Sequence, residues 1–324
     1  MKKKLLAGIL ALALCSTNMP PQTIFAGEFT SGNPDVVSEE ETPEIFTNEE
    51  QEAEGETDEE LSVFSSEEVP EFNDAPDEAM AAAENAQNEV IDLTDNTKVS
   101  GGVYTITSAG DYKFTCSNSQ ETANRIVVDG GNTSEQDNIN IYLNKVNINT
   151  STGPALRINV NVKATVTIYL TGTNNLIAKN TWYAGLQKAN TASLIITTKV
   201  LDPTAGILNA HGSSDGDGAG IGGSNITINS CSVIASSKYG AGIGGNKQGA
   251  GSNITINSAS VTASSTDGAG IGGGLYGDGS DIIINSSSVT ASSTNGAGIG
   301  GGEGNSCSDI TINNSSVTAS STNG

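Results

Sequence analysis

The second half of the chain alternates apolar and polar residues with a period of two. In residues 254–256 (Ile-Thr-Ile) the isoleucines face one side of the backbone and the threonine faces the other. Val261 and Ala263 repeat the alternation, and Ile271 supplies a third apolar group. Asn, Ser and Gly separate these short segments. The pattern predicts three short strands rather than a helix.

The pattern recurs at intervals of about 28 residues. The motif Gly-Ala-Gly-Ile-Gly-Gly occurs four times at spacings of 22, 28 and 28, beginning at Gly218, Gly240, Gly268 and Gly296. The first apolar residue of the leading strand recurs over a longer region, at steps of 27, 28, 32, 28, 28 and 28. These residues are Ile139, Val166, Leu194, Ile226, Ile254, Ile282 and Ile310. About seven repeats are therefore visible.

Three strands per repeat describe one turn, or rung, of a three-sided parallel β-solenoid. Parallel stacking of similar rungs places like residues over like, so each rung's core packs on the next. A barrel or sandwich would need a hairpin at each strand end and would gain nothing from so long a repeat. We therefore expect an all-β solenoid over residues 88–324, with less regular early strands at 103–106, 112–115 and 126–128.

Two sets of polar residues recur at fixed places in the repeat. An asparagine ends each leading strand, where the chain must bend: Asn229, Asn257, Asn285 and Asn313. Stacked Asn side chains can bond the backbone of the bend and each other, so a structural ladder is favoured over a binding role. A threonine column is expected on an outward face: Thr262, Thr290 and Thr318.

The N-terminus has the features of an export signal. Three lysines precede an apolar run, residues 5–15, that is too short to span a bilayer, and residues 24–26 offer a cleavage site. Cys15 invites a lipoprotein interpretation, but Leu14 is unsuited to a lipoprotein signal. We predict a signal peptide over residues 1–26, a secreted or cell-surface location, and no membrane insertion after cleavage.

The net charge of −23 belongs mainly to a tail. Twenty acidic residues lie between Asp35 and Glu84, whereas the chain from Lys98 onwards has thirteen acidic and eleven basic residues, a net of −2. Self-repulsion and few large apolar groups predict a disordered acidic linker over residues 27–87, with a calcium-attracting or partner-binding arm as the alternative. Nucleic acid is disfavoured as a partner because no basic patch is present.

Four aspartates are candidate metal ligands: Asp215, Asp217, Asp281 and Asp309. The last two are one repeat apart, so stacking would place their carboxylates roughly 5 Å from each other. Like charges in this arrangement destabilise a sheet unless solvent screens them or a cation bridges them. Calcium, a hard ion that prefers several oxygen ligands, suits such a column and is the candidate cofactor. Turn residues whose charge is screened by solvent are the favoured interpretation.

Four aromatic residues are candidates for carbohydrate binding: Trp182, Tyr183, Tyr239 and Tyr276. Sugar recognition commonly combines an exposed aromatic face with polar groups that fix the hydroxyls. Tyr276 lies in the six-residue loop that distinguishes the 28-residue spacing from the 22-residue one. The alternative is that Trp182 and Tyr183 pack over the edge of a rung.

The sequence offers few candidate catalytic residues. Hydrolysis or elimination needs a positioned acid or base. His211 is the single histidine, and the repeat implies no acidic partner for it. Arg125 and Arg157 lie in early rungs, far from the clearest carboxylates. We therefore expect no catalytic residues, with a polysaccharide lyase or glycosidase as a minor alternative.

Several motifs, taken in order, resemble a known group. They are residues 90–93 (Val-Ile-Asp-Leu), 101–106 (Gly-Gly-Val-Tyr-Thr-Ile), 124–128 (Asn-Arg-Ile-Val-Val), 183–187 (Tyr-Ala-Gly-Leu-Gln) and the Gly-Ala-Gly-Ile-Gly-Gly series. From Val90 to Gly324 the sequence resembles the secreted carbohydrate-binding-domain proteins of Gram-positive anaerobes. The resemblance implies a right-handed parallel β-helix, related in shape to pectate lyases. It also implies binding of polysaccharide, including acidic plant polymers, with bound calcium and without established catalysis.

Two functions remain open. The first is a non-catalytic module that binds a plant or host polysaccharide along one side of the solenoid, assisted by calcium. The second is a structural or adhesive stalk of a surface protein, with its binding region beyond Gly324. Near identity of the last rungs favours the stalk, and the irregular early rungs with Trp182 favour a site. The sequence stops in phase with its repeat, so truncation at the C-terminus is expected.

Overall fold

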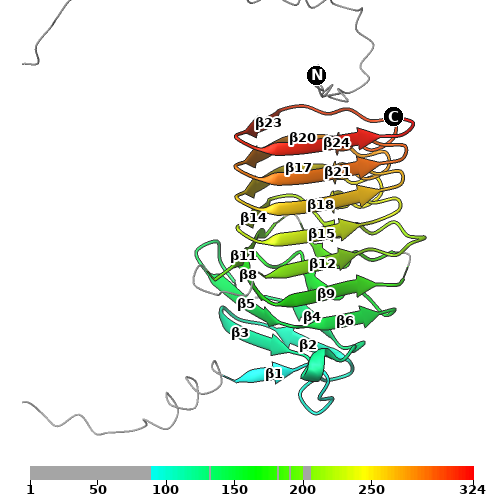
Figure 1. Cartoon of the computed structure of the whole chain (residues 1–324). Coiled ribbons are helices and arrows are strands. Elements are labelled where there is room, and N and C mark those ends of the chain that lie inside the picture. Colours follow the sequence, from blue (N-terminus) through cyan, green and yellow to red (C-terminus); the bar gives the residue numbers. More distant parts are fainter. Residues whose placement is uncertain (1–88, 131–132, 181, 190, 200–205) are drawn as a thin grey trace, which may run out of the picture. The chain divides into compact units, whose positions relative to one another are not determined.

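A computed structural model describes residues 89–324, except 131–132, 181, 190 and 200–205. The chain winds into a solenoid whose strands form three parallel sheets, here called A, B and C (Figure 1). From β5 onwards, successive strands along the chain belong to sheet A, then sheet C, then sheet B. Every pairing between named strands of neighbouring rungs is parallel. This confirms the predicted right-handed parallel β-helix with about 28 residues per rung. Among the described residues, six consecutive rungs contribute one strand to each sheet.

Sheet A has nine strands in the part of the chain that the structure describes. They are β1 (Val90–Asp92), β3 (Gly110–Thr115), β5 (Asn138–Asn144), β8 (Thr165–Thr171), β11 (Ser193–Thr198), β14 (Ile226–Asn229), β17 (Gly251–Asn257), β20 (Gly279–Asn285) and β23 (Ile310–Asn313). The leading apolar residues that mark the repeat pair with one another in sequence order, from Ile139 with Val166 to Ile282 with Ile310. The predicted register is therefore confirmed at every step, including the longer step of 32.

Sheets B and C complete each rung. Sheet B contains β2 (Val103–Ile106), β4 (Arg125–Val128), β7 (Leu156–Ile158), β10 (Leu186–Lys188), β13 (Ile221–Gly222), β16 (Ile243–Gly244), β19 (Ile271–Gly272) and β22 (Ile299–Gly300). Sheet C contains β6 (Asn147–Thr150), β9 (Thr173–Ala178), β12 (Ile207–His211), β15 (Ser232–Ser236), β18 (Ser260–Ser265), β21 (Ser288–Ser293) and β24 (Ser316–Ser321). A 3₁₀ turn, η1 (Ser117–Ser119), follows β3 in the early rungs. The early strands expected from the sequence correspond to β2, β3 and β4.

The core consists of columns of aliphatic side chains, one from each rung. In the regular rungs, Ile226, Ile254 and Ile282 are fully buried and stack on one another. The valines of sheet C and the isoleucines of sheet B form equivalent columns. Burying each such side chain contributes about 2 kcal/mol. Stacking therefore supplies the stability that a single rung cannot provide alone.

The predicted asparagine ladder is present on sheet A. Asn257 Nδ2 donates to Asn229 Oδ1 (2.9 Å), Asn285 Nδ2 donates to Asn257 Oδ1 (3.0 Å), and Asn313 continues the series (2.9 Å). A second ladder, which the sequence analysis missed, joins Asn147, Asn175 and Asn209 on sheet C at 3.2 and 2.8 Å. The threonine column is also present, because Thr262, Thr290 and Thr318 pair in register and are exposed.

In the late strands of sheet A, the residue before the first inward-facing residue has a left-handed backbone conformation. Asn225, Asn253, Asp281 and Asp309 have φ angles of 57°, 54°, 52° and 52°. Asn and Asp adopt this conformation more readily than other residues that have a side chain. The repeated Asn-or-Asp position is therefore explained by backbone geometry at the entrance of each strand.

The described residues belong to one compact unit. The predicted signal peptide (residues 1–26) and acidic linker (27–87) lie outside the described residues. Within the described part of the chain, no helix has the length and apolar character required to cross a membrane.

Replacing Asn257 tests the sheet A ladder. Asn257→Ala removes one donated and one accepted side-chain hydrogen bond, so we expect the free energy of unfolding to fall by about 1–2 kcal/mol. Urea unfolding followed by circular dichroism measures the change. Thr262→Ala, on the exposed face of β18, is the control and should change stability by less than about 0.5 kcal/mol. Equal effects of the two substitutions would contradict a stabilising ladder.

Candidate functional site

One side of the solenoid gathers loops from several rungs. The connections from sheet C to sheet B stack on one another there, and the longer connections from sheet B to sheet A fold back onto them. Tyr239 N donates to Gly216 O (3.3 Å), Lys247 N to Asp217 O (2.8 Å) and Leu275 N to Tyr239 O (2.7 Å). We call this surface the corner strip, formed by Trp182, Tyr183, Asp215, Asp217, Lys238, Tyr239, Lys247, Leu275 and Tyr276.

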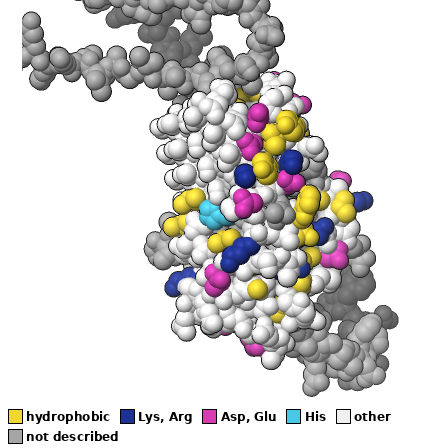
Figure 2. Space-filling view, turned by 90° about the vertical axis from the view of Figure 1, so that its right-hand side faces the viewer, with side chains coloured by type: hydrophobic (Ala, Val, Ile, Leu, Met, Phe, Trp, Pro, Cys, Tyr) yellow, Lys and Arg dark blue, Asp and Glu magenta, His cyan; other side chains and the backbone are white. Residues whose placement is uncertain are grey.

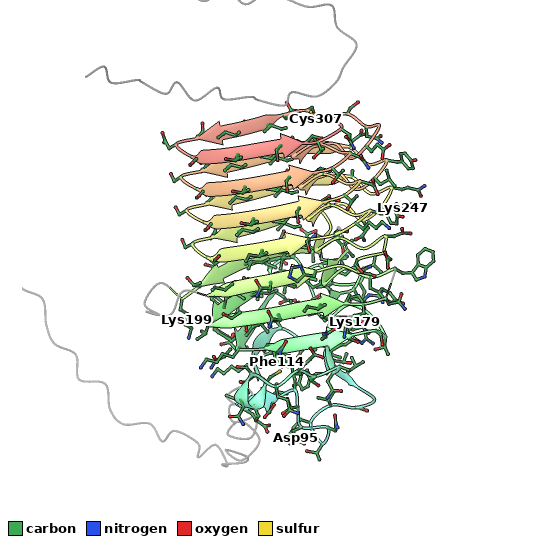
Figure 3. The ribbon with its side chains drawn as sticks, turned by 45° about the vertical axis from the view of Figure 1, so that its right-hand side comes forward. Asp95, Phe114, Lys179, Lys199, Lys247 and Cys307 are labelled. Carbon is green, nitrogen blue, oxygen red and sulfur yellow. The ribbon has the colours of Figure 1, made fainter. Side chains whose placement is uncertain are left out.

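The corner strip differs in composition from the sheets beside it. Figure 2 shows hydrophobic, basic and acidic side chains gathered in a band along this side, next to surface that consists of other polar groups and backbone. Lys179 and Lys247 lie on this side, whereas Lys199 lies on the opposite side (Figure 3). Close stacking of the loops depends on glycine. A Cβ atom at Gly218 would overlap the backbone carbonyl of Tyr183 in the rung before.

The structure brings all four predicted carbohydrate-binding residues to the corner strip. Trp182 and Tyr276 are 68% and 57% exposed, so both rings are available to a ligand. Tyr183 is half-buried. Tyr239 is half-buried and its ring lies 4.8 Å from Lys238 Nζ and 5.1 Å from Lys247 Nζ. Its aromatic surface therefore already contacts two cations.

The φ angle of Tyr276 is 61°, in the left-handed region that bulky residues rarely adopt. Gln248 and Gly304 occupy the same position in the neighbouring six-residue loops, with φ angles of 61° and 77°. The repeated loop geometry therefore imposes this conformation, and it turns the aromatic ring of Tyr276 toward solvent.

Two of the predicted metal ligands form ion pairs in the corner strip. Asp215 Oδ1 lies 3.6 Å from Lys238 Nζ, and Asp217 Oδ1 lies 3.2 Å from Lys247 Nζ. Each carboxylate thus has a neighbouring ammonium group that neutralises its charge. These pairs, with the two lysines over Tyr239, connect two successive rungs electrostatically.

The other two predicted ligands lie elsewhere, at the entrance of sheet A. Asp281 and Asp309 are exposed and stack on adjacent rungs, as expected from the repeat. They continue the column that begins with Asn225 and Asn253. Among the described residues, no group of three or more His, Cys, Asp or Glu side chains is arranged to hold a metal ion. Calcium binding remains a prediction.

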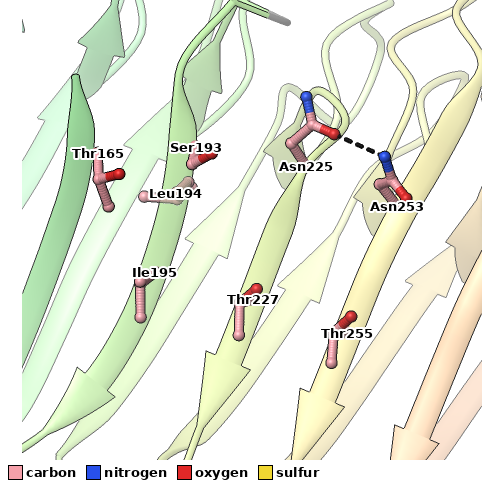
Figure 4. A pocket seen from close by; sticks show the side chains of 8 residues that line it. All are labelled: Thr165, Ser193, Leu194, Ile195, Asn225, Thr227, Asn253 and Thr255. Carbon is pink, nitrogen blue, oxygen red and sulfur yellow. Dashed lines mark hydrogen bonds between the residues drawn. The ribbon is translucent and has the colours of Figure 1, made fainter. Parts of the chain in front are cut away.

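A shallow hollow of about 390 Å³ lies on the outer face of sheet A. It crosses the first residues of four neighbouring strands, β8, β11, β14 and β17 (Figure 4). We call it the sheet A hollow, lined by Thr165, Ser193, Leu194, Ile195, Asn225, Thr227, Asn253 and Thr255. At its edge Asn253 Nδ2 donates to Asn225 Oδ1 (2.9 Å). The sequence analysis did not predict a site at these residues.

A pair of stacked tyrosines on sheet A was also missed. The rings of Tyr142 and Tyr169 lie 4.8 Å apart and nearly parallel, with an interplanar angle of 12°. Lys199 Nζ lies 4.9 Å from the centroid of the Tyr142 ring. The spacing of 27 residues between the two tyrosines equals the local step of the repeat, and this was the available signal.

Lys188 is an unusual member of the solenoid interior. Its side chain is 4% exposed, and its ammonium group donates to the carbonyl oxygens of Ala189 (2.9 Å) and Ser224. No carboxylate in the described part of the chain pairs with it. Burial lowers the pKa of Lys188 to about 8 because the charged form loses hydration.

His211 lies at the end of β12 on sheet C. Its Nδ1 atom forms a hydrogen bond of 2.6 Å with Ser236 Oγ, and burial lowers the pKa of the imidazole. The two residues pair in register on adjacent strands. Stacking along sheet C therefore accounts for this contact.

Comparison with known proteins defines the class. The chain matches the family described as Beta helix repeat over residues 226–247, 254–275 and 282–303. Each matched segment begins at the first inward residue of a sheet A strand and includes one strand of each sheet. No curated protein and no solved structure matches the chain. The protein is therefore a parallel β-helix with tandem repeats, and its resemblance to the secreted carbohydrate-binding group remains a prediction.

Replacing Asp281 tests the column at the entrance of sheet A. Asp281→Asn removes the repulsion with Asp309 and introduces an amide that can donate to the exposed Asn253 side chain. With chelator present, we expect the free energy of unfolding to rise by about 0.5–1 kcal/mol. Urea unfolding of both proteins measures this difference, and a less stable variant would contradict the interpretation.

The same variant tests calcium. If Asp281 and Asp309 bind the ion, the melting temperature of the unmodified protein rises with calcium and that of Asp281→Asn does not. Equal melting of the unmodified protein in calcium and in excess chelator would contradict a calcium site at these residues.

The buried ammonium of Lys188 predicts a pH dependence of stability. Its folded pKa is below its unfolded value of 10.5, so the unfolded chain binds the proton more tightly and the folded state is penalised below pH 8. The penalty, on the order of 3 kcal/mol, should disappear as the pH rises from about 8 to 10.5. Urea unfolding should detect this rise, and Lys188→Met should lack it. Lys179→Met, at an exposed lysine, should retain the rise.

Proposed function

We propose that this protein is a secreted or cell-surface, non-catalytic module that binds polysaccharide. The observation that carries the proposal is the gathering of exposed aromatic residues on one side of the solenoid. Trp182 and Tyr276 come from different rungs and are both more than half exposed. Aromatic rings of this kind stack against the apolar faces of sugar rings, and neighbouring polar groups fix the hydroxyls.

The repeated architecture supports a polymeric ligand. Rungs follow one another at roughly 4.8 Å, so equivalent side chains recur at a fixed spacing along the solenoid. The corner strip presents charged and aromatic groups from several successive rungs. An extended chain of similar units can contact such a surface at several points, and each added contact slows its dissociation.

The second candidate function is a structural or adhesive repeat stalk. The observation that favours it is the close similarity of the rungs formed by β17–β19 and β20–β22, which pair residue for residue in all three sheets. A column of nearly identical rungs sets a length without requiring a specialised site. The two functions differ in whether the isolated protein retains a glycan.

Replacing the exposed aromatic residues tests the binding function. We expect Trp182→Ala and Tyr276→Ala each to weaken polysaccharide binding about tenfold, because each removes one stacking contact. Native affinity electrophoresis with plant and host glycans in the gel, with and without calcium, measures the binding. Thermal unfolding should be unchanged because neither side chain belongs to the core.

Ile234→Ala is the matched control, since Ile234 is 42% exposed but lies on sheet C, away from the corner strip. It should leave binding intact. Failure of every glycan to retard the unmodified protein would favour the stalk. Equal retention of all three variants would remove the corner strip as the binding surface.

A further inference from the structure

The sheet A hollow has the features of a second ligand site, on a different face from the corner strip. Its lining forms two parallel rows across neighbouring strands (Figure 4). One row lies at the strand entrances: Thr165, Ser193, Asn225 and Asn253. The other lies two residues further along: Ile195, Thr227 and Thr255. Successive members of each row are one rung apart.

The hollow lies beside a short connection from sheet B to sheet A. Only residues 223–225 separate β13 from the first inward residue of the next sheet A strand, Ile226. Nine residues, 245–253, separate β16 from the equivalent Ile254, and nine, 273–281, separate β19 from Ile282. The missing six residues account for the repeat spacing of 22 in place of 28. Less chain therefore projects beside the entrance of β14 than beside the strands that follow.

The chemistry of the lining is polar and uncharged. It offers hydroxyl groups from Thr and Ser, amide groups from Asn and methyl groups from Thr and Ile, and no Lys, Arg, Asp or Glu. Asn253 is exposed, and while its Nδ2 donates to Asn225, its Oδ1 accepts no hydrogen bond from the described residues. Alternating hydroxyl and methyl groups match a sugar ring, which presents hydroxyls at its edge and C–H groups on its face.

Negative charge lies directly beyond one end of the hollow. The entrance row continues from Asn253 to Asp281 and Asp309, both exposed, at about 5 and 10 Å by the spacing of the rungs. No lysine or arginine belongs to the lining to offset these carboxylates. An anionic ligand along the row would therefore meet like charge, whereas a neutral ligand would not.

We propose that the sheet A hollow binds an uncharged glycan segment and that Asp281 and Asp309 select against anionic polymers there. The proposal rests on the proposed function, since it concerns the polysaccharide that this protein retains. The neutral segment lies across β8 to β17, along the direction in which the two rows run. Hydroxyl and amide groups of the entrance row bond its hydroxyls, and the second row contacts its ring faces.

Filling the hollow tests the site. Thr227→Tyr places a ring in the second row on an outward position of β14, where a tyrosine is compatible with a strand. We expect about a tenfold loss of affinity for whichever neutral polymer of a panel (hydroxyethyl cellulose, galactomannan, starch and dextran) retards the unmodified protein. Thr290→Tyr, at an outward position of sheet C, is the matched control and should bind normally. Thr255→Tyr provides a second variant, and thermal unfolding verifies that each protein is folded.

Removing the negative charge tests the selectivity. The double variant Asp281→Asn with Asp309→Asn should bind polygalacturonate several-fold more tightly than the unmodified protein. Its affinity for the neutral polymer should change by a smaller factor, because that polymer carries no charge. Measurements at low and high salt should converge for polygalacturonate, because salt screens the repulsion.

The outcomes separate this proposal from the proposed function. Retardation by anionic polymers alone, or full binding of a neutral polymer by folded Thr227→Tyr and Thr255→Tyr, would overturn the proposal for the hollow. In the second case, loss of binding in Trp182→Ala would leave the corner strip as the site and the proposed function intact. Absence of binding to every polymer would overturn both.

Discussion

Parallel pairing of one rung with the next is the constraint on which the structure depends. Because each residue lies over its counterpart in the previous rung, a side chain with a rung on either side is buried, bonded or exposed together with its neighbours in the column. Ile254 is buried between Ile226 and Ile282. The side-chain amide of Asn257 forms hydrogen bonds with those of Asn229 and Asn285. The repeat is therefore a physical requirement of the core.

Surface features arise where neighbouring rungs differ. The six-residue loops that follow β16 and β19 fold back over the corner strip and hold Tyr276 outward. The absence of such a loop before β14 coincides with the hollow on sheet A. One insertion, present in some rungs and missing in another, is thus associated with two distinct surfaces on a single scaffold.

The sequence predicted the fold well because one periodic pattern determines both burial and register. Ile226, Ile254 and Ile282 could be aligned by spacing alone, and their pairing followed. The sites were harder to foresee, because they depend on how loops of different rungs meet. The ion pairs of Asp215 and Asp217 with lysines more than twenty residues away have no periodic signal. Tyr142 and Tyr169 had such a signal, but it lay outside the most regular repeats.

The close match between β17–β19 and β20–β22 has a consequence for how such a chain changes over generations. An in-frame duplication or deletion of 28 codons in this region adds or removes one complete rung, and the strands on either side meet partners equivalent to those they had before. Length can therefore vary without loss of folding. The early rungs differ from one another in sequence, so adding or removing one of them would pair strands that do not match. Trp182 belongs to one of these early rungs.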